Sequence, residues 1–513
     1  MTQHRKARRD FLRAASAFSA GTLGVPFGLN LATMSAASAQ TAGVADYKAL
    51  VCLFLVGGND AANMVLPTDT DSWTRYIATR NQGSDPIALR AVGTAVDAAA
   101  AAASPARLGG VLPIVPTTAQ YVPGTSTVRS FALHPLLTDV QSLFGAGRLA
   151  VLANVGTLIQ PTTKAQYKAR SVPLPTSLFS HNDQQSTWQA GATEGARVGW
   201  GGRMGDLWLS ENGSAGAFTA ISTSGNAVWL SGQSVVQYQV TNSGPVKMNG
   251  LTGSLFGSST AAATLASLVT DTQASAIFAR DYATVVKRSL DAQSVLSAAF
   301  ASAEATAVAA PTQYTNPVTG TLTTNGIATQ LQTVARMIAA RNTLGLKRQV
   351  FFVSVGGFDT HDAQNRGQAD LLARLGHALA YFDGALAAIA GDGGNANIRD
   401  KVTLFTASDF GRTYTTNGDG TDHGWGGHHF ILGGAVKGKN FYGQYPTVGV
   451  SGSPAGFENP DEIGSGTLLP TTSVEQYAAT LGSWFGISDT NLASLFPNLA
   501  NFSTRNLGFM NAG

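Results

Sequence analysis

Runs of consecutive apolar residues, rather than alternating ones, mark the strands that this sequence predicts. Most of these runs end in Gly or Ser beside an acidic residue or a histidine. They are Ala49–Val56, Arg148–Gly156, which lacks the acid, Gln349–Val355 and Lys401–Thr406, with a fifth run, His429–Gly434, soon after. Because continuous apolar runs are typical of strands covered on both faces, we expect a mainly parallel sheet.

Apolar residues at helical spacing occupy stretches between these strands. The pattern predicts helices over residues 135–145, 327–344 and 369–389, the last with leucines along one face. This alternation predicts an α/β fold with a doubly wound, mainly parallel sheet covered by helices. Ligands of such sheets bind beyond the carboxyl ends of the strands, where Asp60, Asp359, His361 and Asp409 fall.

Two stretches break the alternation. Residues 92–106 are mostly alanine and small polar residues, which predicts a surface helix or a loose insertion. Residues 205–325 are rich in Ser, Thr, Gly and Ala, with a helix-like stretch around 264–300. We interpret residues 40–513 as a single domain, in which the block 205–325 is either a cap over the site or a decorated edge.

The first 39 residues read as a targeting segment. Paired Arg8 and Arg9 precede a weakly apolar stretch that ends in a small-residue cleavage sequence at Ala39, which resembles a twin-arginine signal peptide. Several glycines and Pro26 make the stretch a poor membrane anchor. We therefore expect cleavage after Ala39, export of the folded protein by the twin-arginine machinery to the periplasm or medium, and no stable membrane span afterwards.

Removing this segment changes the charge balance. The chain has 33 Lys and Arg against 30 Asp and Glu, and residues 1–39 hold five of the former and one of the latter. A near-neutral remainder of 28 against 29 gives no basic footprint, so we expect no nucleic-acid partner. The single cysteine, Cys52, lies in an apolar run and is interpreted as a small buried hydrophobe.

Histidines and acids gather in two glycine-rich turns, Asp359–Asp362 and Gly420–His429. Divalent metals bind carboxylate oxygen and imidazole nitrogen, and glycine lets the backbone fold closely around an ion. For any one of these residues, capping a helix or holding a turn is an equal alternative. For the whole set, which follows separate predicted strands, a shared site is favoured.

Other polar residues have weaker signals. His134 and His377 are interpreted as structural. Ser180, before His181 in a polar run, is either an ordinary helix N-cap or a hydroxyl in a field that favours an anion or a nucleophile. Arg412 is either an anion clamp or the partner of a carboxylate.

Several motifs together resemble a known bacterial family, the twin-arginine-exported proteins with domain of unknown function 1501, over residues 46 to 505. They are Gly57–Asp60, Ser180–Asp183, Gly356–His361, Ser408–Thr413, Gly420–Gly424, Leu469–Tyr477 and Phe496–Leu499. The family is itself distantly similar to the alkaline-phosphatase and sulfatase superfamily. That similarity implies an alkaline-phosphatase-like fold and two metals around a phosphate or sulfate.

The resemblance also implies roles for individual residues. Ser180 would be the nucleophile and Arg412 would hold the anion. The implied metal ligands are Asp60, Asp359, His361, Asp409 and His423, with Asp422 or His428 able to refill an altered position. The chain departs from the superfamily in two places, because Phe410 rather than a histidine follows Asp409, and because Asp359 and His361 are separated by one residue.

The sequence thus predicts an exported, metal-dependent hydrolase of phosphate or sulfate esters, with Zn, Mn, Fe or Ca as the divalent metal. The alternative is a non-catalytic cell-envelope protein that uses the same cleft to bind a polymer or to assist assembly. The missing histidine after Asp409 and the large block 205–325 favour that alternative. The partner is accordingly an anionic ester or a polymer.

Overall fold

The central strands of the main sheet are formed by apolar runs far apart in the sequence. In the computed structural model, which describes residues 46–511, β1 (Lys48–Leu55) pairs in parallel with β11 (Arg348–Val355) and β12 (Val402–Ser408). Every residue of β1 is buried, as expected for a strand covered on both faces. The predicted signal peptide, residues 1–39, lies outside the described residues.

The main sheet has ten strands, in the order β14, β5, β13, β12, β1, β11, β6, β7, β8, with β15 paired to β5. Its other strands are β5 (Leu149–Gly156), β6 (Ala220–Ser222), β7 (Tyr238–Thr241), β8 (Gly244–Pro245), β13 (Gly427–Gly433), β14 (Phe441–Tyr442) and β15 (Thr472–Ser473). Most neighbouring pairs are parallel, which confirms the α/β class with a mainly parallel sheet.

One predicted strand runs against this pattern. β13 is antiparallel to both of its neighbours, β12 and β5. The connection from β12 to β13, residues 409–426, contains no helix that would carry the chain back to the starting edge of the sheet. The chain therefore turns and returns beside β12, and this turn holds several of the candidate site residues.

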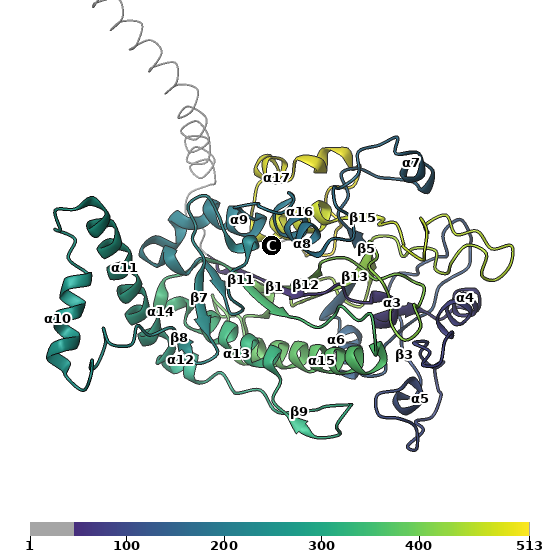
Figure 1. Ribbon diagram of the computed structural model, residues 1–513, viewed down its shortest axis with the longest axis horizontal. Helices are drawn as coiled ribbons and strands as arrows, with labels where there is room; N and C mark the ends of the chain where they lie inside the picture. Colours follow the sequence, from purple (N-terminus) through teal and green to yellow (C-terminus); the bar gives the residue numbers. More distant parts are fainter. Residues whose placement is uncertain (1–45, 512–513) are drawn as a thin grey trace, which may run out of the picture.

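Helices cover the two faces of the sheet in separate layers (Figure 1). On one face lie α6 (Thr138–Gly145), α13 (Gly326–Ala339), α14 (Arg341–Leu344) and α15 (Gln364–Ala388). On the other lie α8 (His181–Ala190), α9 (Trp200–Trp208), α16 (Val474–Phe485) and α17 (Asp489–Leu495). The three predicted helices are thus confirmed, with the second divided at Ala340.

Alternate side chains of β1 supply the two cores between these layers. Val51, Leu53 and Leu55 pack in the cluster with α6, α13 and α15. Cys52 and Phe54 pack in the opposite cluster with α9 and α16. Cys52 is a free, buried thiol, as predicted from its apolar surroundings.

The block 205–325 lies at one edge of the sheet. It supplies β6, β7 and β8, and two helices, α10 (Ser259–Val269) and α11 (Ile277–Phe300), project from it. In Figure 1 these helices stand at the opposite end of the molecule from α3 (Ala61–Met64), which follows the carboxyl end of β1. Residues 92–104 form turns and irregular chain rather than a helix, ahead of the short α5 (Pro105–Leu108).

Smaller elements complete the described chain. They are α4 (Thr70–Arg80), α7 (Lys164–Ala169), α12 (Ala303–Thr306), a three-stranded sheet of β2 (Val65–Pro67), β4 (Phe131–Leu133) and β3 (Leu112–Ile114), and a pair of β9 (Tyr314–Thr315) and β10 (Leu322–Thr323). Within residues 46–511, the helices are either too short or too polar to cross a bilayer.

Candidate metal centre

Side chains from three separate segments meet beyond the carboxyl ends of β11 and β12. His181 is the first residue of α8, Asp359 and His361 follow β11, and His423 lies in the turn before β13. Ligand atoms of His181, Asp359 and His423 all lie within 4.8 Å of one another. We call these three residues the metal triad, because their imidazole and carboxylate groups lie close enough together to hold a divalent ion.

Two imidazole rings hold the carboxylate of Asp359 between them. Nε2 of His181 lies 3.4 Å from Asp359 Oδ2, and Nε2 of His423 lies 3.3 Å from Asp359 Oδ1. The two Nε2 atoms are 3.2 Å apart. His361 stands next to the triad, with its Nε2 3.0 Å from both Asp359 Oδ1 and His423 Nε2.

The other ring nitrogen of each histidine has an oxygen partner. Nδ1 of His181 lies 2.6 Å from Asp409 Oδ2, and Nδ1 of His423 lies 2.7 Å from the carbonyl oxygen of Phe179. Nδ1 of His361 lies 3.2 Å from Asp422 Oδ1. Since these oxygens accept, each Nδ1 is assigned as the protonated nitrogen, which leaves the Nε2 lone pairs directed at one another.

This arrangement fits a metal ion. Two nitrogen lone pairs that face each other cannot form a hydrogen bond without a further proton, whereas a cation binds both. Metal-binding histidines commonly donate their second N–H to a carboxylate or a backbone carbonyl, as His181 and His423 do here. The residues present can therefore hold one divalent ion.

The two triad histidines have opposite protonation preferences. The hydrogen bond with Asp409 raises the pKa of His181, although burial acts against it. Burial lowers the pKa of His423. A proton on Nε2 of His181 would lie between the same two Nε2 atoms that a metal ion would bind. Metal binding here therefore competes with protonation.

Arg412 hydrogen-bonds to Asp359 of the triad rather than being available to an anionic ligand. Its Nη1 donates to Asp359 Oδ1 at 2.5 Å and to the carbonyl of Gly57, and its Nε and Nη2 donate to Thr421. Burial opposes ionisation of Asp359, but the guanidinium more than offsets this and lowers its pKa. Of the two predicted roles, the structure supports the carboxylate partner.

Asp409 is placed behind the triad. Its Oδ2 accepts from His181 and, at 2.9 Å, from Gln185, and its Oδ1 accepts from the backbone N–H of Gly57. The side chain is fully buried. Asp409 therefore orients His181. Asp409 was predicted to be a ligand, but His181 lies in the cluster in its place.

Asp60 was predicted to be a metal ligand, but its hydrogen bonds are to residues outside the triad. Its carboxylate forms an ion pair with Arg80, with an N–O distance of 2.5 Å and both side chains fully buried. Gln364 donates to the same carboxylate at 2.6 Å, and the backbone N–H of Ala62 donates at 3.2 Å. Asp60 is thus the anion of a buried ion pair at the start of α3.

His428 is also directed elsewhere. Its Nδ1 accepts from the backbone N–H of Asn154 at 3.0 Å, and its ring stacks on Tyr445 with 4.3 Å between centroids. Burial lowers its pKa to about 3. With these contacts in the core, the His428 ring is not positioned to bind a metal. Asp422, in contrast, remains 60% exposed beside His361.

Glycines explain how the loops approach so closely. Gly57 and Gly58 both have positive φ, at 117° and 81°. A Cβ at Gly57 would lie 2.4 Å from the backbone nitrogen of Asp359, and one at Gly58 would lie 2.5 Å from the ring of Phe410. Phe410 in turn packs within 4.8 Å of the His181 ring and 4.7 Å of the His423 ring, measured between centroids. The glycine pair after β1 is therefore needed for the triad to assemble.

Ser180 is the N-cap residue of α8, directly before His181, and its side chain makes no capping hydrogen bond. The preceding loop places Phe179 at a φ of 73°, unusual for a residue with a side chain, and so presents the Phe179 carbonyl to His423. His181 was not among the ligands predicted from the sequence. The polar run from Ser180 to Gln185 was the available signal, because it supplies both His181 and the Gln185 amide that binds Asp409.

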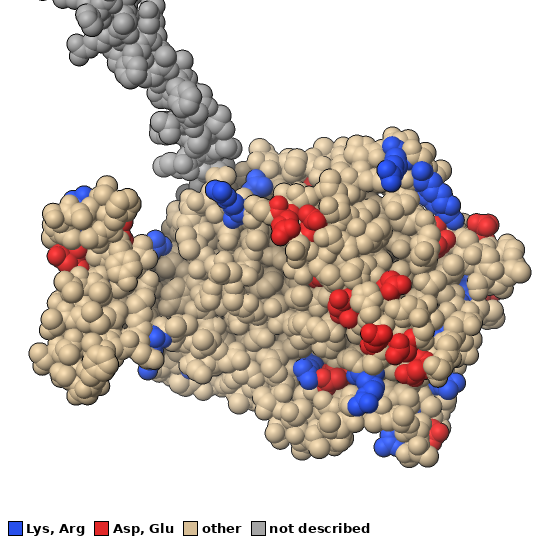
Figure 2. All heavy atoms as spheres, viewed as in Figure 1, with Lys and Arg blue, Asp and Glu red and all other residues tan. Residues whose placement is uncertain are grey.

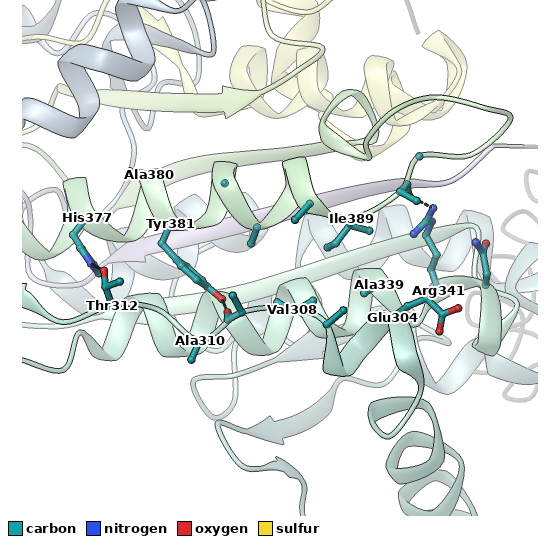
Figure 3. A pocket seen from close by; sticks show the side chains of 18 of the residues that line it. Glu304, Val308, Ala310, Thr312, Ala339, Arg341, His377, Ala380, Tyr381 and Ile389 are labelled. Carbon is teal, nitrogen blue, oxygen red and sulfur yellow. Dashed lines mark hydrogen bonds between the residues drawn. The ribbon is translucent and has the colours of Figure 1, made fainter.

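A cavity of about 810 Å³ lies away from the triad, between α15 and residues 304–312 (Figure 3). His377 lies at one end, held by Asn325 and Thr312. None of the triad residues lines this cavity. His377 thus has fixed partners, in keeping with a structural role, and is a suitable control for experiments on the triad.

Fold and site together define a class: an α/β protein with a histidine–aspartate cluster, able to hold a metal, at the carboxyl ends of its central strands. The chain belongs to the DUF1501 family, described as proteins of unknown function, whose model matches residues 47–496. A search of curated proteins found no significant match.

Proposed function

We propose that this protein is an exported, metal-dependent hydrolase with one divalent ion held by His181, Asp359 and His423. The observation that carries the proposal is the convergence of the Nε2 atoms of both triad histidines, 3.2 Å apart, on one carboxylate. Three protein ligands leave a coordination position open, as is typical of catalytic rather than structural sites.

The donor set limits the choice of metal. Two or three imidazoles with a carboxylate suit Zn, Mn or Fe, whereas Ca prefers oxygen ligands throughout. Arg412 and Asp409 are also consistent with Zn, Mn or Fe, because they hold the carboxylate of Asp359 and the imidazole of His181 in place. We propose one ion rather than two, since two of the residues predicted to bind metal, Asp60 and His428, have other partners.

A divalent ion at this position supplies Lewis-acid activation of water and of the substrate oxygen. The protein side chains contribute orientation and proton transfer. His361, paired with the exposed Asp422, is placed to move a proton between the site and solvent. Ser180 has a hydroxyl free of capping at the start of α8, where the helix dipole favours an anion, and is our proposed nucleophile.

We propose phosphate or sulfate esters as the substrate class, on the strength of the resemblance described above. The Arg412 guanidinium is occupied by Asp359 and Thr421, so the metal and the α8 N-terminus would hold the anion. Transport by the twin-arginine route, with loading of the ion before export, would suit a protein whose three ligands come from three distant segments.

The alternative, a non-catalytic protein that binds a polymer or assists assembly at the cell envelope, is favoured by the same engagement of Arg412. The Arg412 guanidinium, bonded to Asp359, Gly57 and Thr421, is not free to stabilise charge that develops in a transition state. Activity distinguishes the two.

The test is elemental analysis of purified protein, followed by turnover of aryl phosphate and aryl sulfate esters. We expect one equivalent of Zn, Mn or Fe in the wild type and in His377→Gln, and its loss in the double variant His181→Ala/His423→Ala. Ester turnover should disappear in Ser180→Ala while the metal is retained. Metal without turnover would favour the binding protein, and equally negligible metal in wild type and double variant would refute the proposal.

A further inference from the structure

The helical hairpin of α10 and α11 carries an apolar surface that no other part of residues 46–511 covers. The hairpin projects from one end of the molecule (Figure 1), and Figure 2 shows this lobe with few charged side chains. Phe278 is 86% exposed, and Tyr282 and Val285 are each 63% exposed. Three neighbouring large apolar side chains in water cost free energy unless a partner covers them.

These side chains form one stripe along α11. Phe278, Tyr282 and Val285 follow one another at intervals of four and three residues, which places them on the same side of a helix. Ala283 and Val286, by contrast, are buried. One apolar side of the hairpin is therefore buried by packing within the protein, and the adjacent apolar stripe is exposed to solvent.

Two residues of opposite charge lie beside the stripe, one on either side of its last member along the helix. Asp281 lies four residues before Val285, and Arg288 lies three residues after it, on the same flank of the helix. Neither has an ion-pair partner within the part of the chain that the structure describes. Lys287 and Asp291, further round the helix, already pair with each other at 3.1 Å.

Such an arrangement is complementary to itself. If a second α11 runs antiparallel to the first, with a two-fold axis at Val285, then Val285 meets its own copy. Asp281 of each copy then faces Arg288 of the other, because residues on the same flank meet in an antiparallel helix pair. We propose that the protein forms a symmetric dimer through α11, with a second copy of this chain as the occupant of the stripe.

A groove at the base of the hairpin fits the same geometry. About 580 Å³ in volume, it is lined by residues of α11 and of the segment 209–218, among them Phe218, Ala292 and Val295. Ala292 lies seven residues beyond Val285, and Phe278 lies seven residues before it. The two-fold axis therefore brings Phe278 of the second copy to Ala292, at the apolar wall of this groove.

The test combines a cross-link with a charge swap. Because Cys52 is buried, Val285→Cys introduces the one exposed thiol, and mild oxidation should give a disulfide-linked dimer. Thr264→Cys, an exposed position on α10, is the control and should not cross-link. Asp281→Arg should raise the dissociation constant, measured by analytical ultracentrifugation, by about tenfold or more, because two like-charged pairs replace two ion pairs.

The double variant Asp281→Arg/Arg288→Asp should restore dimerisation, since both pairs re-form with reversed charge. Glu304→Arg, at an exposed acid on α12 outside the proposed interface, should leave the dimer unchanged. A monomeric mass for the wild type across micromolar concentrations would overturn the proposal, as would failure of the double variant to recover. Sedimentation with lipid vesicles, abolished by Phe278→Ser in a protein that stays monomeric, would show instead that the stripe serves a membrane surface.

Discussion

The Nδ1 atom of His181 lies 2.6 Å from Oδ2 of Asp409, and this contact decides which nitrogen of His181 is free to bind. Asp409 is fully buried and also accepts from Gln185 and from the backbone of Gly57. Its position is therefore fixed by three donors, and the imidazole is fixed with it. A carboxylate that the sequence suggests as a metal ligand acts here through the histidine in front of it.

Asp409→Asn should weaken metal binding without removing it. The amide keeps the shape but loses the charge that fixes the His181 tautomer, so affinity should fall about ten- to a hundredfold. Competition with a fluorescent zinc chelator measures this change. Asp362→Asn, an exposed acid next to His361, is the control and should bind like the wild type. Complete loss of metal in Asp409→Asn would mean that Asp409 is itself a ligand.

Asp60→Asn should destabilise the fold and leave the metal content intact. The substitution leaves the buried Arg80 without its anion, and loss of one partner of a buried ion pair costs about 3–5 kcal/mol. Urea unfolding and elemental analysis of the same sample separate the two effects. Asp71→Asn, an exposed acid on α4, should change neither quantity. Loss of metal from folded Asp60→Asn protein would restore Asp60 to the ligand set.

Stability should fall on acidification below pH 6.5, even without metal. Burial lowers the pKa of His134, His428 and His429 to about 3 each. Between pH 6.5 and 3 the unfolded chain takes up protons that the folded protein excludes, so the free energy of unfolding decreases by up to about 1.4 kcal/mol per pH unit for each histidine. Urea titrations of chelator-treated protein at pH 5 and 7 measure the slope, which His429→Gln should reduce. An unchanged slope would contradict neutral burial of His429.

Glu475→Gln should stabilise the protein at alkaline pH. Burial raises the pKa of Glu475, partly offset by the hydrogen bond that Asn498 donates to it at 2.7 Å. A raised carboxyl pKa gives stability below the unfolded value, which is lost as the pH rises through the folded value. Glutamine avoids the cost of burying the charge, so the variant should be more stable than the wild type at pH 8. Thermal unfolding at pH 8 and pH 4 tests this, with the advantage expected at pH 8 alone.

Much of the fold could be predicted from the sequence, because buried strands must be continuously apolar. The runs that became β1, β5, β11 and β12 show this directly. The direction of β13 could not be predicted, since an apolar run has the same composition whichever way it points. The strands β6, β7 and β8 toward one edge of the sheet have two to four residues each, which is too short to show a period.

The sequence predicted where the candidate site lies, but only some of the residues that form it. Asp359, His361 and His423 follow from acids and histidines in glycine-rich turns. Their neighbours depend on tertiary partners that no local pattern reveals: Arg80 binds Asp60, and Gln185 helps to hold Asp409 behind His181. The carbonyl of Phe179 could not have been found at all, because a backbone group carries no sequence signal.

The central place of β1 has a consequence for how the protein folds. Next to β1, the Tyr47 hydroxyl donates to Gln349, a residue 302 positions later, and β12 comes later still. Contacts between such distant residues form slowly, because a long loop must close before any pairing stabilises it. While the chain is being synthesised, the apolar run Lys48–Leu55 therefore stays without its sheet neighbours and is open to aggregation. Productive folding should depend on a chaperone, or another holding factor, that shields this segment until residues 348–408 have left the ribosome.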